Sequence, residues 1–442
     1  MRLCGKRLQL NLEPDQTELR RIEGDSLNMP AISPAVPKPD HIPEALVYDF
    51  DYLADPDVVK NAHERALEIV REAPPIFWTP RHGGHWVLKG YNAVFEGQRD
   101  TARFSNSPMT FDQMQALNAN LPDDKKLFFS APISFDPPQH AVYRGPLLAA
   151  FSPKAIAALK DDIRALAAEL IESIKPAGKC EFMMAVAEPL PVTIFLRIFG
   201  LPSERQREYR DIVKEYFLAT DLSPEASQAR ARQVADVLHD TIMDRKENPQ
   251  GDLISMLWQA EFNGQPATLY DMENYCVMLF IAGLDTVMNG MGLGVCHLAN
   301  NLEFQQRLRA NPAEVPAATE ELLRRYTFTL PVRFAREDVE FQGVQFKKGE
   351  MALVFLPGAD LDPTVFTDPE QFIMGREDVT HIAFGAGPHR CLGSHLARIE
   401  LNILYEEMLS RLPEFRIDPD NPTYYHGGFV WGPEKLHLVW DI

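Results

Sequence analysis

The chain has few cysteines for its 442 residues, and they are widely separated. There are five, an odd number, which gives no disulfide framework and predicts a reducing compartment: Cys4, Cys180, Cys276, Cys296 and Cys391. The cysteine nearest to Cys391 in sequence is Cys296. Zinc and iron–sulfur sites need several ligands, so both are excluded as explanations for Cys391.

Long apolar runs and excess positive charge are also missing. The longest apolar run, Val277 to Leu284, is far shorter than the roughly 18 residues of a membrane helix. The first 30 residues lack the charged-then-apolar order of a signal peptide. We therefore expect a cytoplasmic protein without a membrane anchor. The net charge of −19 argues against binding to nucleic acid.

Composition divides the chain into an arm and one large domain. The first 28 residues are polar and charged without periodicity, and a proline-rich stretch, 29–43, follows them. We predict a flexible N-terminal arm over residues 1–39 and a single catalytic domain over 40–442. The arm is expected either to be disordered or to precede the native start, because Met29 stands just before Pro30.

Apolar spacing predicts a mostly helical domain with minor β structure. Apolar residues spaced three and four apart favour helices over 154–174, 228–244 and 269–302. The last of these is apolar on most faces, so we expect it in the core. Strands are predicted near the ends of the domain, with 76–78 and 85–88 as a hairpin around Gly83-Gly84. Further strands are expected over 339–346 paired with 351–356, and over 436–440.

Cys391 lies in a glycine-punctuated loop that leads into a helix-like stretch. Glycines allow backbone to approach a flat group closely, and a following helix directs N–H groups and a positive dipole at the sulfur. Both features predict a lowered thiol pKa and a thiolate that ligates metal. One thiolate without a protein co-ligand is the pattern of a proximal haem ligand.

The segment from Phe384 to Gly393, Phe-Gly-Ala-Gly-Pro-His-Arg-Cys-Leu-Gly, resembles the haem-binding signature of the cytochromes P450 at every fixed position. The resemblance covers about residues 40–442. It implies haem b, iron ligated by Cys391, and cofactor contacts from Phe384, Gly385 and Gly393. It also implies the family's fold, a triangular helical prism around a buried haem, and a monomer.

The middle of the long predicted helix reads Ala282-Gly283-Leu284-Asp285-Thr286, which matches the family's Ala/Gly-Gly-x-Asp/Glu-Thr motif. Glycine and an acid are costly in an apolar helix, and such local conflict points to function. The resemblance implies that Ala282 and Gly283 contact the cofactor, with a groove for dioxygen at Gly283. It assigns proton management to Asp285 and Thr286. A threonine hydroxyl that merely bonds its own helix is the alternative for Thr286.

Two further motifs of the family recur. Glu321 and Arg324, three apart on a helix, resemble its buried structural Glu-x-x-Arg pair, although Gln371 stands where a third, arginine partner is often found. Four basic residues match its propionate ligands, which need cationic or imidazole partners: His140, Arg144, Arg333 and His389.

Parts of the chain look most like the bacterial camphor-hydroxylase branch. The tyrosine that binds the camphor ketone in that branch falls on Phe128, which has no donor. The implied pocket is wholly apolar: Phe128, Phe129, Met278, Ile281, Ala282, Val332, Phe429 and Val430. A cineole-sized bicyclic monoterpenoid is therefore favoured over camphor as substrate.

The implied reaction inserts one atom of O2 into a C–H bond and needs two electrons. The chain has no flavin or iron–sulfur motif and no Gly-x-Gly-x-x-Gly loop, so a partner must supply them. The resemblance implies a two-iron ferredoxin with an NADH-dependent flavin reductase. Because the net charge of −19 offers no overall attraction to an acidic ferredoxin, we expect a local basic patch on the cysteine side, including Arg144 and Arg390, to steer docking. A haem-based sensor without turnover and a peroxide-driven hydroxylase are the alternatives.

Overall fold

The computed structural model describes residues 31–122, 125–218, 223–377 and 380–442. Most of the predicted arm lies outside these residues. Its described end is held to the domain, because Ser33 N donates to Asp51 (2.7 Å) and Val36 N to Pro80 O (2.9 Å). The packed domain therefore starts before residue 40.

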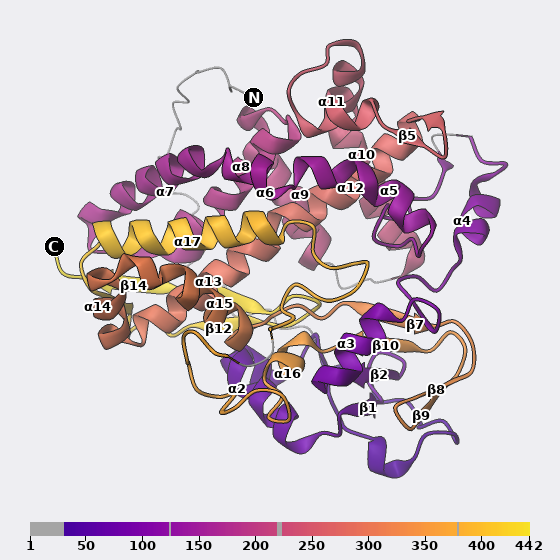
Figure 1. Ribbon diagram of the computed structural model, residues 1–442, viewed down its shortest axis with the longest axis horizontal. Helices are drawn as coiled ribbons and strands as arrows, with labels where there is room; N and C mark the ends of the chain where they lie inside the picture. The colour runs from indigo at the N-terminus through magenta and orange to yellow at the C-terminus, as the bar shows by residue number, and fades with distance from the viewer. Residues whose placement is uncertain (1–30, 123–124, 219–222, 378–379) are drawn as a thin grey trace.

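Helices make up most of the molecule, with small sheets to one side (Figure 1). The helices are α2 (Pro56–Glu72), α3 (Tyr91–Arg99), α4 (Phe111–Asn118), α5 (Gln139–Ala150), α6 (Pro153–Ala157), α7 (Lys160–Ile174), α8 (Pro189–Phe199), α9 (Gln206–Leu218), α10 (Pro224–Glu247), α11 (Leu253–Trp258), α12 (Leu269–Leu284), α13 (Thr286–Ala299), α14 (Leu302–Ala310), α15 (Val315–Arg325), α16 (Leu356–Asp360) and α17 (Ser394–Arg411). The predicted fold class, mainly α with small sheets, is confirmed.

The main sheet has the strand order β1-β2-β10-β7-β3. Its strands are β1 (Ile76–Thr79), β2 (His85–Leu88), β3 (Phe104–Ser105), β7 (Val332–Ala335) and β10 (Met351–Val354). The remaining strands form smaller sheets: β4 (Lys179–Glu181), β5 (Glu261–Phe262), β6 (Gln265–Pro266), β8 (Val339–Phe341), β9 (Val344–Phe346), β11 (Phe415–Ile417), β12 (Tyr424–His426), β13 (Gly432–Lys435) and β14 (His437–Trp440).

Strand pairing confirms one sequence prediction and corrects another. β1 and β2 form the predicted antiparallel hairpin, with Gly83 and Gly84 in the left-handed region that its turn requires. The predicted pairing of 339–346 with 351–356 is wrong. The two halves of the first segment, β8 and β9, pair with each other, and β10 pairs with β2 and β7.

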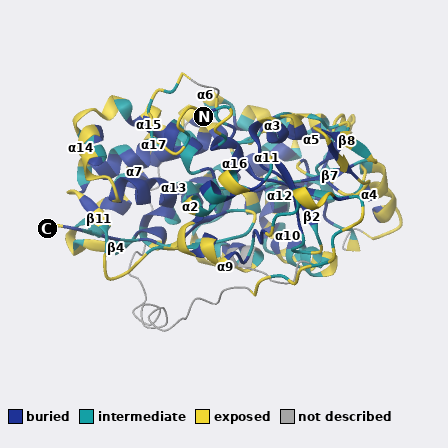
Figure 2. Cartoon of the chain, turned by 90° about the horizontal axis from the view of Figure 1, so that it is seen from below, coloured by how far each residue is buried: buried dark blue, intermediate teal, exposed yellow. Residues whose placement is uncertain are grey.

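Two predicted helices are each interrupted. Residues 154–174 divide into α6 and α7 at Ala158-Leu159, and the long core helix divides into α12 and α13 at Asp285. Taken together, Leu269–Ala299 is long and apolar enough to span a membrane, but half of its most apolar stretch is buried inside the protein. Figure 2 shows α13 among the buried elements, which is the pattern of a core helix.

Candidate haem-thiolate site

The loop that carries Cys391 is closed by backbone and by one buried side chain of α3. Cys391 N donates to Phe384 O (2.8 Å), and Ala386 N donates to Gln98 Oε1 (2.8 Å). Gly387 has φ of +71°, and a Cβ there would lie 2.7 Å from Gln98 O. The glycine therefore permits both the turn and the close approach of α3. Sequence reasoning missed Gln98, because a lone glutamine carries no motif.

A charged cluster fixes the other side of this loop. Arg398 of α17 lies over the Phe384 ring (4.5 Å to its centroid) and donates to Glu320, to which His381 is also hydrogen-bonded (3.0 Å). Burial favours the neutral acid, yet hydrogen bonds from His381 and Arg398 lower the pKa of Glu320 to about 2. Glu320 therefore stays ionised, and the cluster ties α15 and α17 to the loop.

The Cys391 thiol has exposed surface but lies deep among surrounding residues. Burial raises its pKa more than the Gly393 N–H, Arg144, Arg390 and Arg398 lower it. The prediction that the loop and helix alone lower this pKa is therefore wrong, because desolvation outweighs the nearby positive charges. Deprotonation needs the charge of a metal, which removes the proton of a coordinating thiol.

The four predicted propionate ligands come together from three distant segments. His140 and Arg144 lie on α5, Arg333 on β7, and His389 on the cysteine loop. The rings of His140 and His389 have centroids 4.1 Å apart. Burial and the positive neighbours lower the pKa of His389 to about 2 and that of His140 to about 4. Burial lowers the pKa of Arg333 to about 10.

This arrangement fits haem. Within the described ranges no group hydrogen-bonds to either buried ring nitrogen of His389 or to Nε2 of His140. A buried polar group left unsatisfied costs about 1–3 kcal/mol, so the N–H groups of these rings call for an acceptor such as a carboxylate. A Cβ at Gly393 would meet only Cys391 Sγ within 4 Å, which leaves room beside the thiol. Cys391 would hold the iron, and the four basic residues would hold the propionates.

The Ala282–Thr286 motif lies where the core helix breaks. Thr286 Oγ1 donates to Ala282 O (3.3 Å), so the hydroxyl makes the local helix bond that was the alternative reading of this residue. Burial raises the pKa of Asp285; His426 opposes the shift, whereas Glu188 and Glu434 add to it. A carboxyl with a raised pKa holds its proton closer to working pH.

Gly283 differs from its predicted role. A Cβ there would lie 2.3 Å from the Phe195 ring of α8, so the glycine allows α12 to pack closely against α8. Its side-chain direction is filled by Phe195 and does not open onto a groove. Any opening in this helix arises instead from the break at Asp285.

The Glu321–Arg324 pair is buried, as predicted. Arg324 donates two hydrogen bonds to Glu321, each 2.8 Å long, and both side chains are almost inaccessible. Arg376 takes the role of the third, arginine partner that is missing at position 371, since its Nε donates to Glu321 (3.0 Å). The backbone carbonyl of Gln371 accepts hydrogen bonds from Arg324 (3.2 Å) and Arg376 (2.8 Å). The sequence reasoning missed Arg376, which lies five positions after Gln371.

Two predicted pocket residues lie in a segment whose backbone is clamped by amide side chains. Gln228 of α10 bonds both Phe128 N (2.8 Å) and Phe128 O (2.9 Å). Asn274 of α12 accepts from Phe129 N (2.8 Å). The segment thus reaches α12 one helical turn before Met278, which shares a face with Ala282; Ile281 lies beside them on the same helix.

The remaining pocket residues lie on two adjoining segments. A β-bridge joins Thr329 to Val430, and Leu330 N donates to Phe429 O (2.8 Å), which brings Val430 near the segment that leads to Val332. Phe429 is 44% exposed, and its ring stacks on Tyr52 (5.0 Å between centroids). Phe429 therefore lies with the segment around Tyr52, a residue the sequence reasoning did not include.

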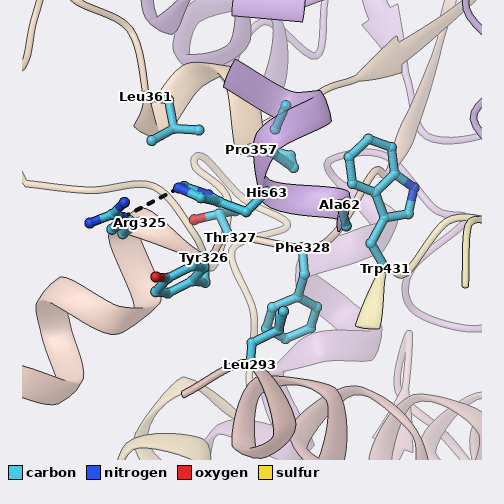
Figure 3. Close-up of a pocket in the computed structure, with 11 residues that line it drawn as sticks. Ala62, His63, Leu293, Arg325, Tyr326, Thr327, Phe328, Pro357, Leu361 and Trp431 are labelled. Atoms are coloured by element: carbon cyan, nitrogen blue, oxygen red, sulfur yellow. Dashed lines mark hydrogen bonds between the residues drawn. The ribbon is translucent and has the colours of Figure 1, made fainter. Parts of the chain in front are cut away.

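A small cavity lies between α2, α15 and α16 (Figure 3). Arg325 Nε donates to His63 Nε2 (3.3 Å) in its wall, and its free volume of about 10 Å³ is roughly what one water molecule needs. None of the predicted site residues lines it.

Comparisons with known proteins identify the family of this chain. The family model for cytochrome P450 matches residues 182–440. "Probable cytochrome P450 127A1" of Sinorhizobium fredii is 33% identical, over 91% of this chain and 97% of that protein. "Cytochrome P450-terp" of a Pseudomonas species is 27% identical, over 90% and 97%. The crystal structure of CYP101J2 superposes with a TM-score of 0.81 at 33% identity and covers 92% of this chain and all of that one. The chain therefore belongs to the cytochrome P450 family, whose members bind haem b and act as monooxygenases.

Proposed function

We propose that this protein hydroxylates a compact, apolar bicyclic monoterpenoid of cineole size. The observation that carries the proposal is the uniformly apolar set of pocket residues, in which Phe128 offers no donor to a ketone. The likeness to cytochrome P450-terp supports a terpenoid substrate. When bound, haem supplies the dioxygen chemistry that inserts one oxygen atom into a C–H bond and releases the other as water.

The protein's own residues orient the substrate and keep water out of the site. Phe129, Met278, Ile281, Ala282, Val332 and Val430 hold the substrate by apolar contact and exclude water. Asp285, whose carboxyl has a raised pKa, is the group we assign to proton delivery, and Thr286 keeps its hydroxyl at the helix break. A sensor without turnover needs no such pair, and peroxide-driven hydroxylases replace it, so both alternatives are disfavoured. We expect NADH-dependent product formation when ferredoxin and reductase are present, and little product with hydrogen peroxide alone.

Substrate choice is tested by difference-spectrum titration of the purified protein with cineole and camphor. Cineole is expected to bind more tightly, and tighter binding of camphor would contradict the proposal. In Phe128→Tyr the new hydroxyl should strengthen camphor binding by about 1 kcal/mol, or about fivefold, the worth of one hydrogen bond. Camphane, the same skeleton without the ketone, is the control and should gain nothing.

We further propose that a two-iron ferredoxin, itself reduced by an NADH-dependent flavin reductase, docks on the cysteine side in the cytoplasm. With a net charge of −19, the whole molecule does not attract an acidic ferredoxin, so a local basic patch must guide docking. Arg390 is exposed there, and Arg144 donates to its backbone carbonyl. Leu148, which is 55% exposed, lies one turn beyond Arg144 on α5 and adds apolar contact area.

Arg390→Glu should slow reduction by ferredoxin of order tenfold, because it reverses a charge that steers encounter. The carbonyl that Arg144 contacts is retained in the variant, so the haem spectrum should not change. Stopped-flow reduction at low salt measures the rate. Arg416→Glu, on β11 and half exposed, is the matched control and should reduce normally. An equal rate in both variants would contradict the docking site.

A further inference from the structure

The hairpin β12–β13 packs against α13 and places a histidine beside the helix break. His426 is opposite Gly432 in the register of the hairpin. A Cβ on Gly432 would lie 1.9 Å from Asn289 Oδ1. Gly432 therefore leaves the space in which the fully buried Asn289 side chain sits between the hairpin and the helix.

Asn289 connects His426 to Asp285. His426 Nε2 lies 3.1 Å from Asn289 Oδ1. On its other side, Asn289 Nδ2 donates to Asp285 O (3.1 Å) and approaches Asp285 Oδ2 (3.5 Å). The Asp285 backbone carbonyl can only accept, so it fixes the amide with Nδ2 towards Asp285 and Oδ1 towards His426.

This orientation determines the hydrogens on His426. Nε2 faces the Asn289 oxygen, and Nδ1 faces Gly427 O at 3.3 Å. Both partners accept and neither donates, so both ring nitrogens must carry hydrogen for both bonds to form. A ring with two N–H groups is an imidazolium cation.

Charged groups from several elements surround this point. Asp285 from the α12–α13 junction, Glu188 next to α8 and Glu434 from β13 are the carboxyl groups that interact around this point, and Arg210 pairs with Glu188. Burial raises the pKa of Asp285, and the charge of His426 opposes that shift. His426 thus limits how far the pKa of the Asp285 carboxyl rises.

We propose that His426 and Asn289 are positioning residues for Asp285, joined as an imidazolium–amide–carboxyl bridge. An amide does not exchange protons readily, so the bridge transmits orientation and charge and is not itself a proton path. It holds the Asp285 carboxyl and the carbonyl at the helix break in one arrangement. The inference rests on the proposed role of Asp285 in proton delivery, but not on the identity of the substrate.

The first test observes the ring itself and needs no turnover. Histidine-ring ¹⁵N spectra of the carbon-monoxide-bound ferrous holoprotein near neutral pH should show a doubly protonated ring that disappears in His426→Gln. That signal should persist in His437→Gln, which alters a histidine of the neighbouring strand β14. A singly protonated His426 ring in the wild type would overturn the bridge.

The second test measures coupling of NADH consumption to product. His426→Gln should raise the share of electrons lost to hydrogen peroxide and lower product per NADH about tenfold, less than the 10²–10⁴ for losing a proton donor outright. Gly432→Ala, which displaces Asn289 without removing a polar group, should do the same. Substrate affinity and the carbon monoxide spectrum should stay as in the wild type. Normal coupling in both variants would overturn the inference.

Discussion

Cys391→Ser is expected to lose the red-shifted Soret band of the reduced, carbon-monoxide-treated protein, together with hydroxylase activity down to background. A serine oxygen is a poor thiolate substitute, because the sulfur ligand donates the electron density that drives cleavage of dioxygen. The measurement is a reduced carbon monoxide difference spectrum, with haem content determined in parallel.

Cys180→Ser is the matched control, since this half-buried cysteine of β4 lies apart from the site. It should keep both the band and the activity. A Cys391→Ser protein that retained the red-shifted band would remove the basis for every assignment in the haem-thiolate site.

Glu321→Ala is expected to cause the largest loss of stability among single substitutions outside the haem ligands. It leaves Arg324 and Arg376 buried beside each other without their shared carboxylate. Removing one partner of a buried ion pair costs about 3–5 kcal/mol in the free energy of unfolding. Urea unfolding of the holoprotein, followed by tryptophan fluorescence and the Soret band, measures the loss.

Arg71→Ala provides the comparison, because the ion pair of Arg71 with Glu370 is about half exposed at both residues. Its effect should stay within about 0.5 kcal/mol, as is usual for surface substitutions. Equal midpoints for the two variants would show that the Glu321 cluster contributes no more than a solvated pair. Glu321→Gln, which keeps acceptors for the arginines, should recover part of the difference.

The sequence was most informative where chemistry demands fixed spacing. The loop from Phe384 to Gly393 and the pair Glu321–Arg324 were predicted because each motif is local and its residue types are hard to replace. The grouping of His140, Arg333 and His389 followed from family resemblance alone. Nothing in their spacing along the chain indicates that the fold brings them together.

Long-range and energetic features were not predictable in this way. The role of Arg376 depends on how residues 367–376 fold back on α15, and the partners of β10 are strands distant in sequence. The break at Asp285 interrupts a strongly apolar pattern that by itself favours one continuous helix. The raised pKa of Cys391 depends on a balance between burial and three arginines, which no motif encodes.

The clamp on residues 128 and 129 separates main-chain conformation from side-chain identity. Gln228 and Asn274 grip peptide groups, which every amino acid except proline presents in the same form. New side chains at these two positions should therefore reshape the cavity wall while the loop keeps its path. Saturation mutagenesis at these two positions should yield folded variants with altered regioselectivity. For the same reason, relatives can change substrate range by substitution at these two positions while the backbone structure is retained.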